Sequence, residues 1–550
     1  RKSLIGLHMG RWIAVTLVAA WLPHALAWTP VVRPTALRRA PVAEVSHVAG
    51  KEEATLPRGR LFALRASSGP VTDTDEAVGG GEEAVAVTAQ AGVSVSAWFE
   101  AALEAAVPDT GLPPQVVEKR SEGKTLLPDH NVPQRKQEAW RFNNIQTMFA
   151  IEPSTPADSS SVSSDALAPY MYAETAGATA VFVDGVFRPE LSDLGSVPDN
   201  VVFGAVSSVG DRLSETHLGM LDELPEVKGS DHRTNQGAAA FAALNQACFV
   251  DSACIYVPDG VQVEQPVEVL FVSTASTSAR PTSYPRAIIA MGKDAELSLV
   301  QSYATVGGDK HFTNGLTVVA IDENAKLDHF YVQDVAAGAT HYDALIANVS
   351  SGGEHKFCTT LLGGEQSRLN CDVHLNGDGA RAEVVSVLVT DNRQMADFHS
   401  SISHHVENTT SFQQQRNILG GRSDVVFRGR IKVDQEAQNT DSEQLCRSLL
   451  LTDRAKITVM PSLEIIADQV VCTHGATVAD LSADELFYLQ SRGLTPELAR
   501  ALLTKGFVRE FADRFTCKDA LGQLDDKIEK LVKEVRNKAN KSKYNTYTSV

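Results

Sequence analysis

Short apolar runs alternate with turns along the middle of the chain, from about residue 254 to residue 470. The runs are rich in β-branched and aromatic residues and the turns in Gly, Asp and Asn, as in CIYVPDG, PVEVLFVST, LTVVAIDENA and RAEVVSVLVT. Runs of this length bounded by such turns predict short β-strands. Since no helical periodicity interrupts them, we expect the segment to consist of stacked strand–turn units.

These strand–turn phrases repeat along the segment. Similar phrases are centred on Ala295, Ala325, Ala380 and Ala455. The spacings between these alanines are roughly multiples of 25 to 30 residues, about the length of one solenoid rung. We therefore predict a right-handed parallel β-helix over residues 251–478. A β-sandwich is the alternative that the pattern alone leaves open.

Helical periodicity flanks the β-rich segment on both sides. In SVSAWFEAALEAAV, Trp98, Phe99, Leu103 and Ala106 recur at the spacing of one helix face, which predicts a helical N-terminal domain over residues 93–250. The chain is thus expected to be mainly β, with a helical domain at each end of the β-helix.

The C-terminal helical domain is predicted over residues 479–516. Ser482 and Glu485 form a capping box, Gly493 is placed to end the first helix, and Thr495-Pro496 starts the second. The residues expected to face inward are Leu486, Leu489, Leu498, Ala499 and Leu502.

Residues 517–550 predict one amphipathic helix and a polar tail. The apolar positions step by three and four residues, at Leu521, Leu524, Ile528, Leu531 and Val535. Such a stripe either packs on the chain's own domain or binds a helix of a partner.

The N-terminal 92 residues are predicted to be targeting sequence and linker. From Met9, the expected start, one arginine precedes an apolar run ending in Ala25-Leu26-Ala27, the layout of a signal peptide over residues 1–27. Residues 28–69 are rich in Arg, Pro and Ala, as in a transit peptide, and residues 70–92 form an acidic, Gly-rich linker.

A signal peptide followed by a transit peptide, with Trp28 at the junction, resembles the bipartite targeting sequences of algae with complex plastids. This predicts a protein of the plastid stroma, without stable membrane insertion after processing. An ordinary secreted protein is the alternative.

Charge and cysteine usage exclude several classes. The formal charge of −18 argues against a nucleic-acid-binding protein, which normally has a basic face. Seven scattered cysteines without a CxxC pair match neither a disulfide framework nor a zinc finger. We therefore expect a compartment in which thiols stay reduced, with the cysteines other than Cys472 as buried thiols.

Common catalytic motifs are missing. EGKT at residues 122–125 resembles the end of a phosphate-binding loop, but Glu118 stands where that loop needs Gly. The words RIK (430–432) and NTD (439–441) resemble pectinase motifs, in the opposite order and without the intervening Gly-His-Gly. An ATPase of that type and a polysaccharide hydrolase are both disfavoured.

Cys472 and His474 form the one notable pair of potential metal ligands, in the stretch VVCTHGATVADL. On a strand both side chains project to the same face, with Cα atoms roughly 7 Å apart, while Thr473 points the other way. Thiolate and imidazole bind iron or zinc. An iron–sulfur cluster needs about four ligands, so a complete site requires others from the fold or from a partner.

Longer stretches carry a family resemblance. PSLEIIADQVVCTHGATVADLSADELFYLQSRGLTPELARALLTKGF resembles the C-terminal signature of the SufD branch of the SufB/SufD family, scaffold subunits of the Suf iron–sulfur cluster assembly machinery. FRGRIKVDQEAQNTDSEQLCRSLLLTDRAKI and the Glu-x-Trp-Arg element of PQRKQEAWRFNNI, with Trp140-Arg141, fit it too. The likeness covers roughly residues 130 to 516.

The resemblance implies a scaffold without catalytic activity of its own. It implies a SufB-like partner paired through the β-helix and a SufC ATPase docked on the C-terminal helices, with Phe487, Tyr488, Arg492 and Phe507 as docking candidates. It also implies that His474 and Cys472 contribute half of a site at the SufB interface, where a transient iron–sulfur cluster is shared. The family's usual Asp-Asp before this strand is Asp468-Gln469 here, which leaves the second acid without a counterpart.

Two other classes of function remain open at the level of the residues. One is a self-contained metal-binding protein that uses Cys472, His474 and His404-His405. The other is a carbohydrate-active β-helix enzyme. Dependence on partner proteins distinguishes the scaffold from both.

Overall fold

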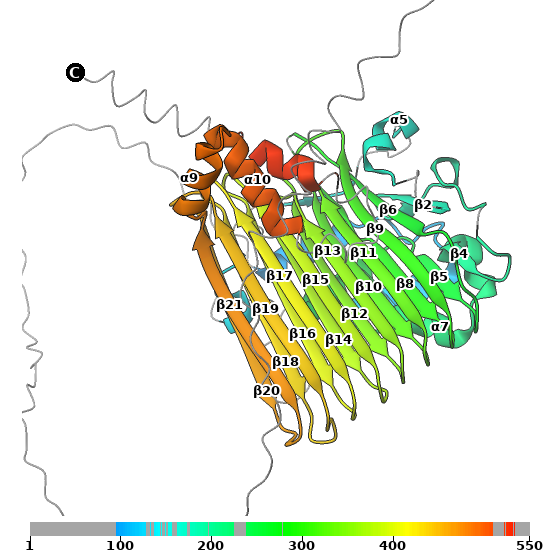
Figure 1. The fold of residues 1–550 in the computed structure, drawn as a ribbon. Helices are drawn as coiled ribbons and strands as arrows, with labels where there is room; N and C mark the ends of the chain where they lie inside the picture. The colour runs from blue at the N-terminus through cyan, green and yellow to red at the C-terminus, as the bar shows by residue number, and fades with distance from the viewer. Residues whose placement is uncertain are drawn as a thin grey trace, which may run out of the picture. The chain divides into compact units, whose positions relative to one another are not determined.

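Two parallel sheets, built from alternate strands of the chain, stack face to face in the computed structural model (Figure 1). The structure describes residues 95–127, 133, 137–143, 145, 149, 152–156, 162–172, 177–195, 197–224, 238–277, 279–509, 522, 524–531 and 533. The signal peptide, the transit peptide and the linker predicted over residues 1–92 lie outside these residues, as does Cys517.

One sheet contains the even-numbered strands from β8 to β20 and is extended by β5 and β4. Its strands are β4 (Val202–Ala205), β5 (Ala253–Val257), β8 (Arg286–Met291), β10 (Phe312–Ile321), β12 (Thr340–Val349), β14 (Gln366–Leu375), β16 (Met395–His404), β18 (Asp424–Val433) and β20 (Lys456–Ile465), with β7 (Arg280–Ser283) and β1 (Pro153–Ser154) attached beside β10. The other sheet contains β3 (Val186–Phe187), β2 (Ala178–Val183), β6 (Val267–Thr274), β9 (Glu296–Val306), β11 (Lys326–Asp334), β13 (Glu354–Leu361), β15 (Arg381–Thr390), β17 (Thr410–Leu419), β19 (Asp441–Leu450) and β21 (Val471–Asp480).

This alternation of consecutive strands between two parallel sheets is a parallel β-helix and confirms the predicted fold class. Successive strands of one sheet are one rung apart, so Glu354 pairs with Arg381, and Thr410 pairs with Asp441. Inward-facing side chains such as Val384 fill the space between the sheets with a continuous apolar core. The β-sandwich alternative is excluded.

The repeat read from the alanines is correct for three of the four. Ala295, Ala325 and Ala380 directly precede β9, β11 and β15, and so lie at one corner of the β-helix. Ala455 precedes β20 in the other sheet, so its distance from Ala380 is not a whole number of rungs. The path along the chain from Ala380 to Ala455 is about two and a half rungs, which moves a residue to the opposite corner.

Helices lie at both ends of the described chain. The α-helices are α2 (Val95–Glu104), α3 (Pro114–Leu126), α5 (Ser164–Leu167), α6 (Val206–Val209), α7 (Glu215–Gly219), α8 (Ala238–Cys248), α9 (Ala483–Ser491) and α10 (Pro496–Arg509). The 3-10 turns are η2 (Glu138–Trp140), η4 (Ala168–Tyr170), η5 (Pro189–Leu191), η6 (Gly210–Arg212) and η7 (Met220–Asp222). Because β2 and β4 pair with β6 and β5, the sheets extend upstream of residue 251.

The N-terminal helices pack on the outer face of the sheet that contains β10 and β12. Trp98 and Phe99 are buried, as their spacing predicted, in a cluster with Phe241, Phe312 and Tyr342. The rings of Trp98 and Phe312 meet edge to face, 5.2 Å between centroids. Aromatic packing of this kind fixes the helices to the sheet.

The C-terminal helices begin and end where the local signals placed them. Ser482 Oγ accepts from the backbone N–H of Glu485, Gly493 has a φ of +90°, and α10 starts at Pro496. The predicted inward faces were partly wrong: Ala499 is buried, but Leu498 and Leu502 are 54% and 44% exposed. A short amphipathic helix has one inward stripe, and α10 turns these two leucines to solvent.

The amphipathic helix of the tail packs on its own domain. Leu524, Ile528 and Leu531 are buried against outward-facing residues of the sheet, including Val385 and Val387. Leu521 and Val535 lie outside the described residues. Within the described part of the chain, no helix is long and apolar enough to span a membrane.

Candidate functional site at the end of the β-helix

Cys472 and His474 lie on the inner face of β21. Cys472 pairs in register with Ser442 and His474 pairs with Gln444, both of which are buried between the sheets. Thr473 pairs with Glu443, which is exposed on the outer face. The prediction that Cys472 and His474 share one face is confirmed, and that face is the continuation of the core.

The core is open at this position, because β20 and β21 are the last strands of their sheets (Figure 1). Ile465 and Val478 are aligned with the inward-facing residues Val433 and Ser448 of the neighbouring strands. They are nevertheless 42% and 49% exposed. The other inward-facing residues of the last rung are Ile457, Val459, Pro461 and Leu463 on β20, and Cys472, His474 and Ala476 on β21. In the described part of the chain, no strand pairs with the outer edges of β20 and β21. Apolar side chains and unpaired backbone groups are therefore presented together, beside a thiol and an imidazole.

The two side chains differ in environment. Cys472 is half-buried and packs against a small apolar cluster that includes Ile431 and Val433. Burial raises the pKa of the Cys472 thiol, and the carboxylate of Asp441 raises it further. His474 is exposed at the open end. The pair thus combines a half-buried thiol of raised pKa with an exposed histidine side chain.

The raised pKa makes the reactivity of Cys472 a direct test of this environment. In a Cys517→Ser background, we expect iodoacetamide to alkylate Cys472 more slowly than a free cysteine at pH 7.5, with a rate that climbs above pH 9. The reason is that the thiolate is the nucleophile and a raised pKa lowers its population. Five other cysteines are buried, as predicted: Cys248, Cys254, Cys358, Cys371 and Cys446. Mass-spectrometric mapping compares the alkylation of Cys472 with that of these buried thiols. Fast alkylation of Cys472 at pH 7 would contradict the assignment.

His404 and His405 do not join the pair. His404 is buried between the sheets, where its ring nitrogens contact Thr409 Oγ1 at 2.8 Å and Ser411 Oγ at 2.9 Å. His405 lies outside the core and contacts Asp434 and His374. Among the residues that the structure describes, no three His, Cys, Asp or Glu side chains are grouped so as to hold a metal ion.

Comparison with known proteins identifies the family. The family model "SUF system FeS cluster assembly, SufBD core domain" matches residues 271–507, and "SufBD protein N-terminal region" matches residues 105–269. The chloroplastic protein ABCI7 of Arabidopsis thaliana is 30% identical over 437 residues, 78% of this chain and 88% of that protein. The chain belongs to the SufBD family.

Two bacterial relatives extend the same picture. An iron–sulfur cluster assembly SufBD family protein of Synechocystis sp. is 27% identical over 417 residues, 74% of this chain and 89% of that protein. The iron–sulfur cluster assembly protein SufD of Escherichia coli is 25% identical over 387 residues, 70% of this chain and 85% of that protein. The chain is accordingly a scaffold-type component of Suf iron–sulfur cluster assembly.

The Trp-Arg element lies in the stretch matched by the SufBD N-terminal model and contacts the stretch matched by the core model. Trp140 is fully buried, and the guanidinium of Arg368 stacks on its ring at 3.8 Å. Arg368 Nη1 also donates to Asp397 at 2.8 Å, and Asn143 Nδ2 donates to the same carboxylate. Sequence reasoning missed Arg368 and Asp397, because they lie far along the chain from Trp140, on strands β14 and β16.

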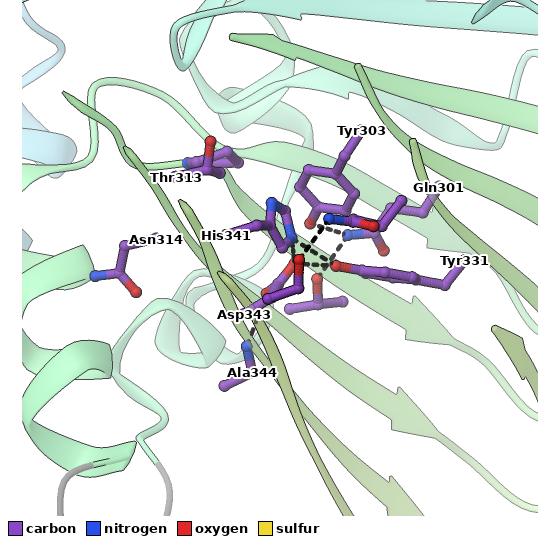
Figure 2. A network of polar contacts seen from close by, with 12 residues as sticks. Gln301, Tyr303, Thr313, Asn314, Tyr331, His341, Asp343 and Ala344 are labelled. Atoms are coloured by element: carbon purple, nitrogen blue, oxygen red, sulfur yellow. Dashed lines mark hydrogen bonds and ion pairs between the residues drawn. The ribbon is translucent and has the colours of Figure 1, made fainter. Parts of the chain in front are cut away.

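A second buried network crosses the core of the SufBD domain (Figure 2). The Tyr331 hydroxyl donates to Asp343 at 2.8 Å and contacts His341 Nε2 at 2.9 Å, while the Ala344 N–H donates to the other Asp343 oxygen. Gln301 Nε2 donates to the Tyr303 hydroxyl at 2.7 Å. These groups come from neighbouring rungs of both sheets, so no local motif signals them. Buried polar networks of this kind favour one register of stacking.

The four docking candidates separate into two groups. Phe487 and Tyr488 on α9 are 73% and 51% exposed, and Arg492 lies over the Tyr488 ring at 5.1 Å. Phe507 on α10 is half-buried against the core, with the Arg416 guanidinium 4.7 Å above its ring. Phe487, Tyr488 and Arg492 thus form one accessible surface, and Phe507 anchors α10.

Proposed function

We propose that this chain is the SufD-type scaffold of a SufB–SufC–SufD complex, and that a SufB-like paralogue pairs with it at the open end of the β-helix. The observation that carries the proposal is the uncapped last rung, with its exposed apolar row and the ligand pair Cys472 and His474. A solenoid needs a polar cap or a partner at each end. A second β-helix that continues the edges of β20 and β21 would satisfy the free backbone groups.

The same geometry explains why the Cys–His pair is incomplete by itself. Two ligands are about half of what an iron–sulfur cluster requires. A partner docked at the open end would bring its own ligands to within reach of Cys472 and His474, and the nascent cluster is the cargo of the assembled pair. His474 can bind iron as a neutral imidazole without rearrangement, since it is already exposed. Cys472 must lose its proton on binding iron.

Removing the imidazole tests this half-site. We expect His474→Ala to lower iron–sulfur cluster formation in the complex severalfold, while the thermal unfolding of the subunit stays unchanged because His474 is exposed. Cluster yield is measured by absorbance and bound iron after reconstitution. His217→Ala, at a half-buried histidine in the N-terminal region, is the control. Wild-type cluster yield in the His474→Ala complex would refute the role.

A SufC-like ATPase is proposed to dock on α9. The double variant Phe487→Ala/Tyr488→Ala should weaken binding of the ATPase at least about tenfold, because exposed aromatic side chains are typical binding hot spots. Pairing with the SufB-like paralogue should persist. Phe142→Ala, which also removes a substantially exposed phenylalanine (40%), is the control. Calorimetric titration of the ATPase measures the effect, and unchanged affinity would exclude this docking surface.

The plastid stroma is the proposed location. ABCI7 and ABCI8 of Arabidopsis thaliana are both named chloroplastic, which supports the targeting predicted from residues 1–69. Residues 1–92 fused to a fluorescent protein should direct it to the plastid of an alga with complex plastids, and secretion of the fusion would contradict the proposal.

The experiment that tests the complex as a whole is native mass spectrometry. The chain from about residue 93 is coexpressed with SufB- and SufC-like partners. A complex that contains all three proteins supports the scaffold. A monomer that ignores both partners but retains metal supports a self-contained metalloprotein instead.

A further inference from the structure

Three arginines occupy equivalent positions in consecutive turns at one corner of the β-helix. Each arginine lies two residues before the start of a strand: Arg393 before β16, Arg422 before β18 and Arg454 before β20. The first residues of these three strands pair in register. Neighbouring rungs are roughly 4.8 Å apart, so the three side chains start from a ladder with that spacing. In the turns of the opposite corner, acids lie three residues before β11, β15 and β17, at Glu323, Asp378 and Glu407.

The turns that carry Arg393 and Arg422 are held rigidly together. The Arg422 N–H donates to Asn392 O at 2.6 Å, and the Gly420 N–H donates to Thr390 O at 2.8 Å. Gly421 has a φ of +58°, and a Cβ there would lie 2.5 Å from the backbone nitrogen of Asn392. Only glycine permits this approach, which fixes the relative positions of the backbones from which the two arginine side chains extend.

A cavity of about 700 Å³ lies beside this ladder. It is lined by Asp309, Lys310, Ala337, Gly338, Glu365, Asn392, Arg393, Gln394, Gly421 and Arg422. The volume falls within the roughly 300–1,000 Å³ typical of small-molecule sites. A smaller cavity of about 120 Å³ shares Ala337, Asn392 and Gln394 with it. It adds the buried Asp391 and, from the amphipathic helix of the tail, Lys527 and Lys530.

The charges around the cavity favour an anion. Both acids that line the cavity have partners within the protein. Asp309 Oδ1 accepts from the Gly338 N–H at 2.8 Å, and Glu365 Oε2 lies 3.6 Å from Nη2 of the buried Arg280. In the described part of the chain, the side chains of Lys310, Arg393 and Arg422 have no acidic partner within salt-bridge distance.

We propose that this corner cavity binds a small phosphorylated molecule with at least two phosphate groups, held by Arg393 and Arg422. Two guanidinium groups on adjacent rungs match neighbouring phosphates, because each can donate two parallel hydrogen bonds to one phosphate. Lys310 supplies a further positive charge, and the cavity has room for an organic group beyond the phosphates. The site is separate from Cys472 and His474, which lie on the inner face of the last rung.

Calorimetric titration of the full chain with inorganic pyrophosphate tests the proposal. We expect saturable binding of one pyrophosphate per chain, weakened at least about tenfold in Arg393→Gln/Arg422→Gln, since each lost guanidinium removes charge-assisted hydrogen bonds. Lys326→Gln/Arg381→Gln removes the same charge at the opposite corner and should leave binding intact. Arg393 and Arg422 are exposed and form no ion pair with any residue that the structure describes, so thermal unfolding should be unchanged.

Three results would overturn the proposal. The first is the absence of saturable binding to the wild-type chain. The second is equal weakening by both double variants, which would mean that pyrophosphate responds only to overall charge. The third is displacement of pyrophosphate by an equimolar acidic peptide such as hexaglutamate, which would assign the corner to a protein partner.

Discussion

Replacing Arg368 by methionine should lower the free energy of unfolding by about 3–5 kcal/mol, the cost of leaving one member of a buried ion pair without its partner. Both Arg368 and Asp397 are 1% exposed. The guanidinium also donates to the backbone oxygen of Ala139 at 2.9 Å and covers the Trp140 ring. The substitution therefore removes contacts that hold the N-terminal segment to the sheet and leaves the buried Asp397 without its arginine, in contact with Asn143 and His399. Urea-induced unfolding measures the loss.

Two further variants make this test specific. Arg381→Met removes an exposed arginine and should cost less than about 0.5 kcal/mol, as surface substitutions do. Adding Asp397→Asn to Arg368→Met should recover part of the loss, because the buried charge is then removed while the contact with Asn143 can persist. If Arg368→Met lowers the free energy of unfolding by less than about 1 kcal/mol, the ion pair of Arg368 and Asp397 does not hold the N-terminal segment on the sheet.

The pH dependence of the same variant has a definite sign. Burial and the charge of Arg368 lower the pKa of His399 from 6.5 to about 4, so the native state resists a proton that the unfolded state accepts. Wild-type stability therefore falls as pH drops through this range. Without Arg368 the native state accepts the proton more readily. The stability difference between wild type and Arg368→Met should narrow between pH 6.5 and pH 4.

Charging the open end of the β-helix should abolish pairing with the SufB-like partner and leave the subunit folded. Ile465→Asp/Val478→Asp places two carboxylates where the proposed interface buries apolar surface. An unpaired buried charge costs several kcal/mol, and about 2.7 kcal/mol already weakens an affinity a hundredfold. Both residues are more than 40% exposed in the single chain, so thermal unfolding should change little.

The matched control for the open end is Val186→Asp, at a valine that is 37% exposed on β3, near the opposite end of its sheet. This variant should pair normally in native mass spectrometry. Normal pairing of Ile465→Asp/Val478→Asp would exclude the open end as the interface. Loss of pairing together with a large fall in the unfolding temperature would instead assign the two residues to the stability of the last rung.

The sequence by itself determined the features that depend on neighbouring residues. Strand–turn alternation predicted the β-helix, the capping residues Ser482 and Gly493 placed the ends of α9, and the two-residue spacing placed Cys472 and His474 on one face. These predictions succeeded because hydrogen bonds at a helix end and the alternation of a strand involve residues close along the chain.

Only the tertiary structure decided which residues meet across rungs. Because the rungs differ in length, sequence spacing alone does not show which residues of successive turns are aligned, as Arg393 and Arg422 are. The contact between Trp140 and Arg368 joins distant segments. The exposure of Leu498 and of the last rung depends on what packs against each face, and that is a property of the assembled core rather than of the local pattern.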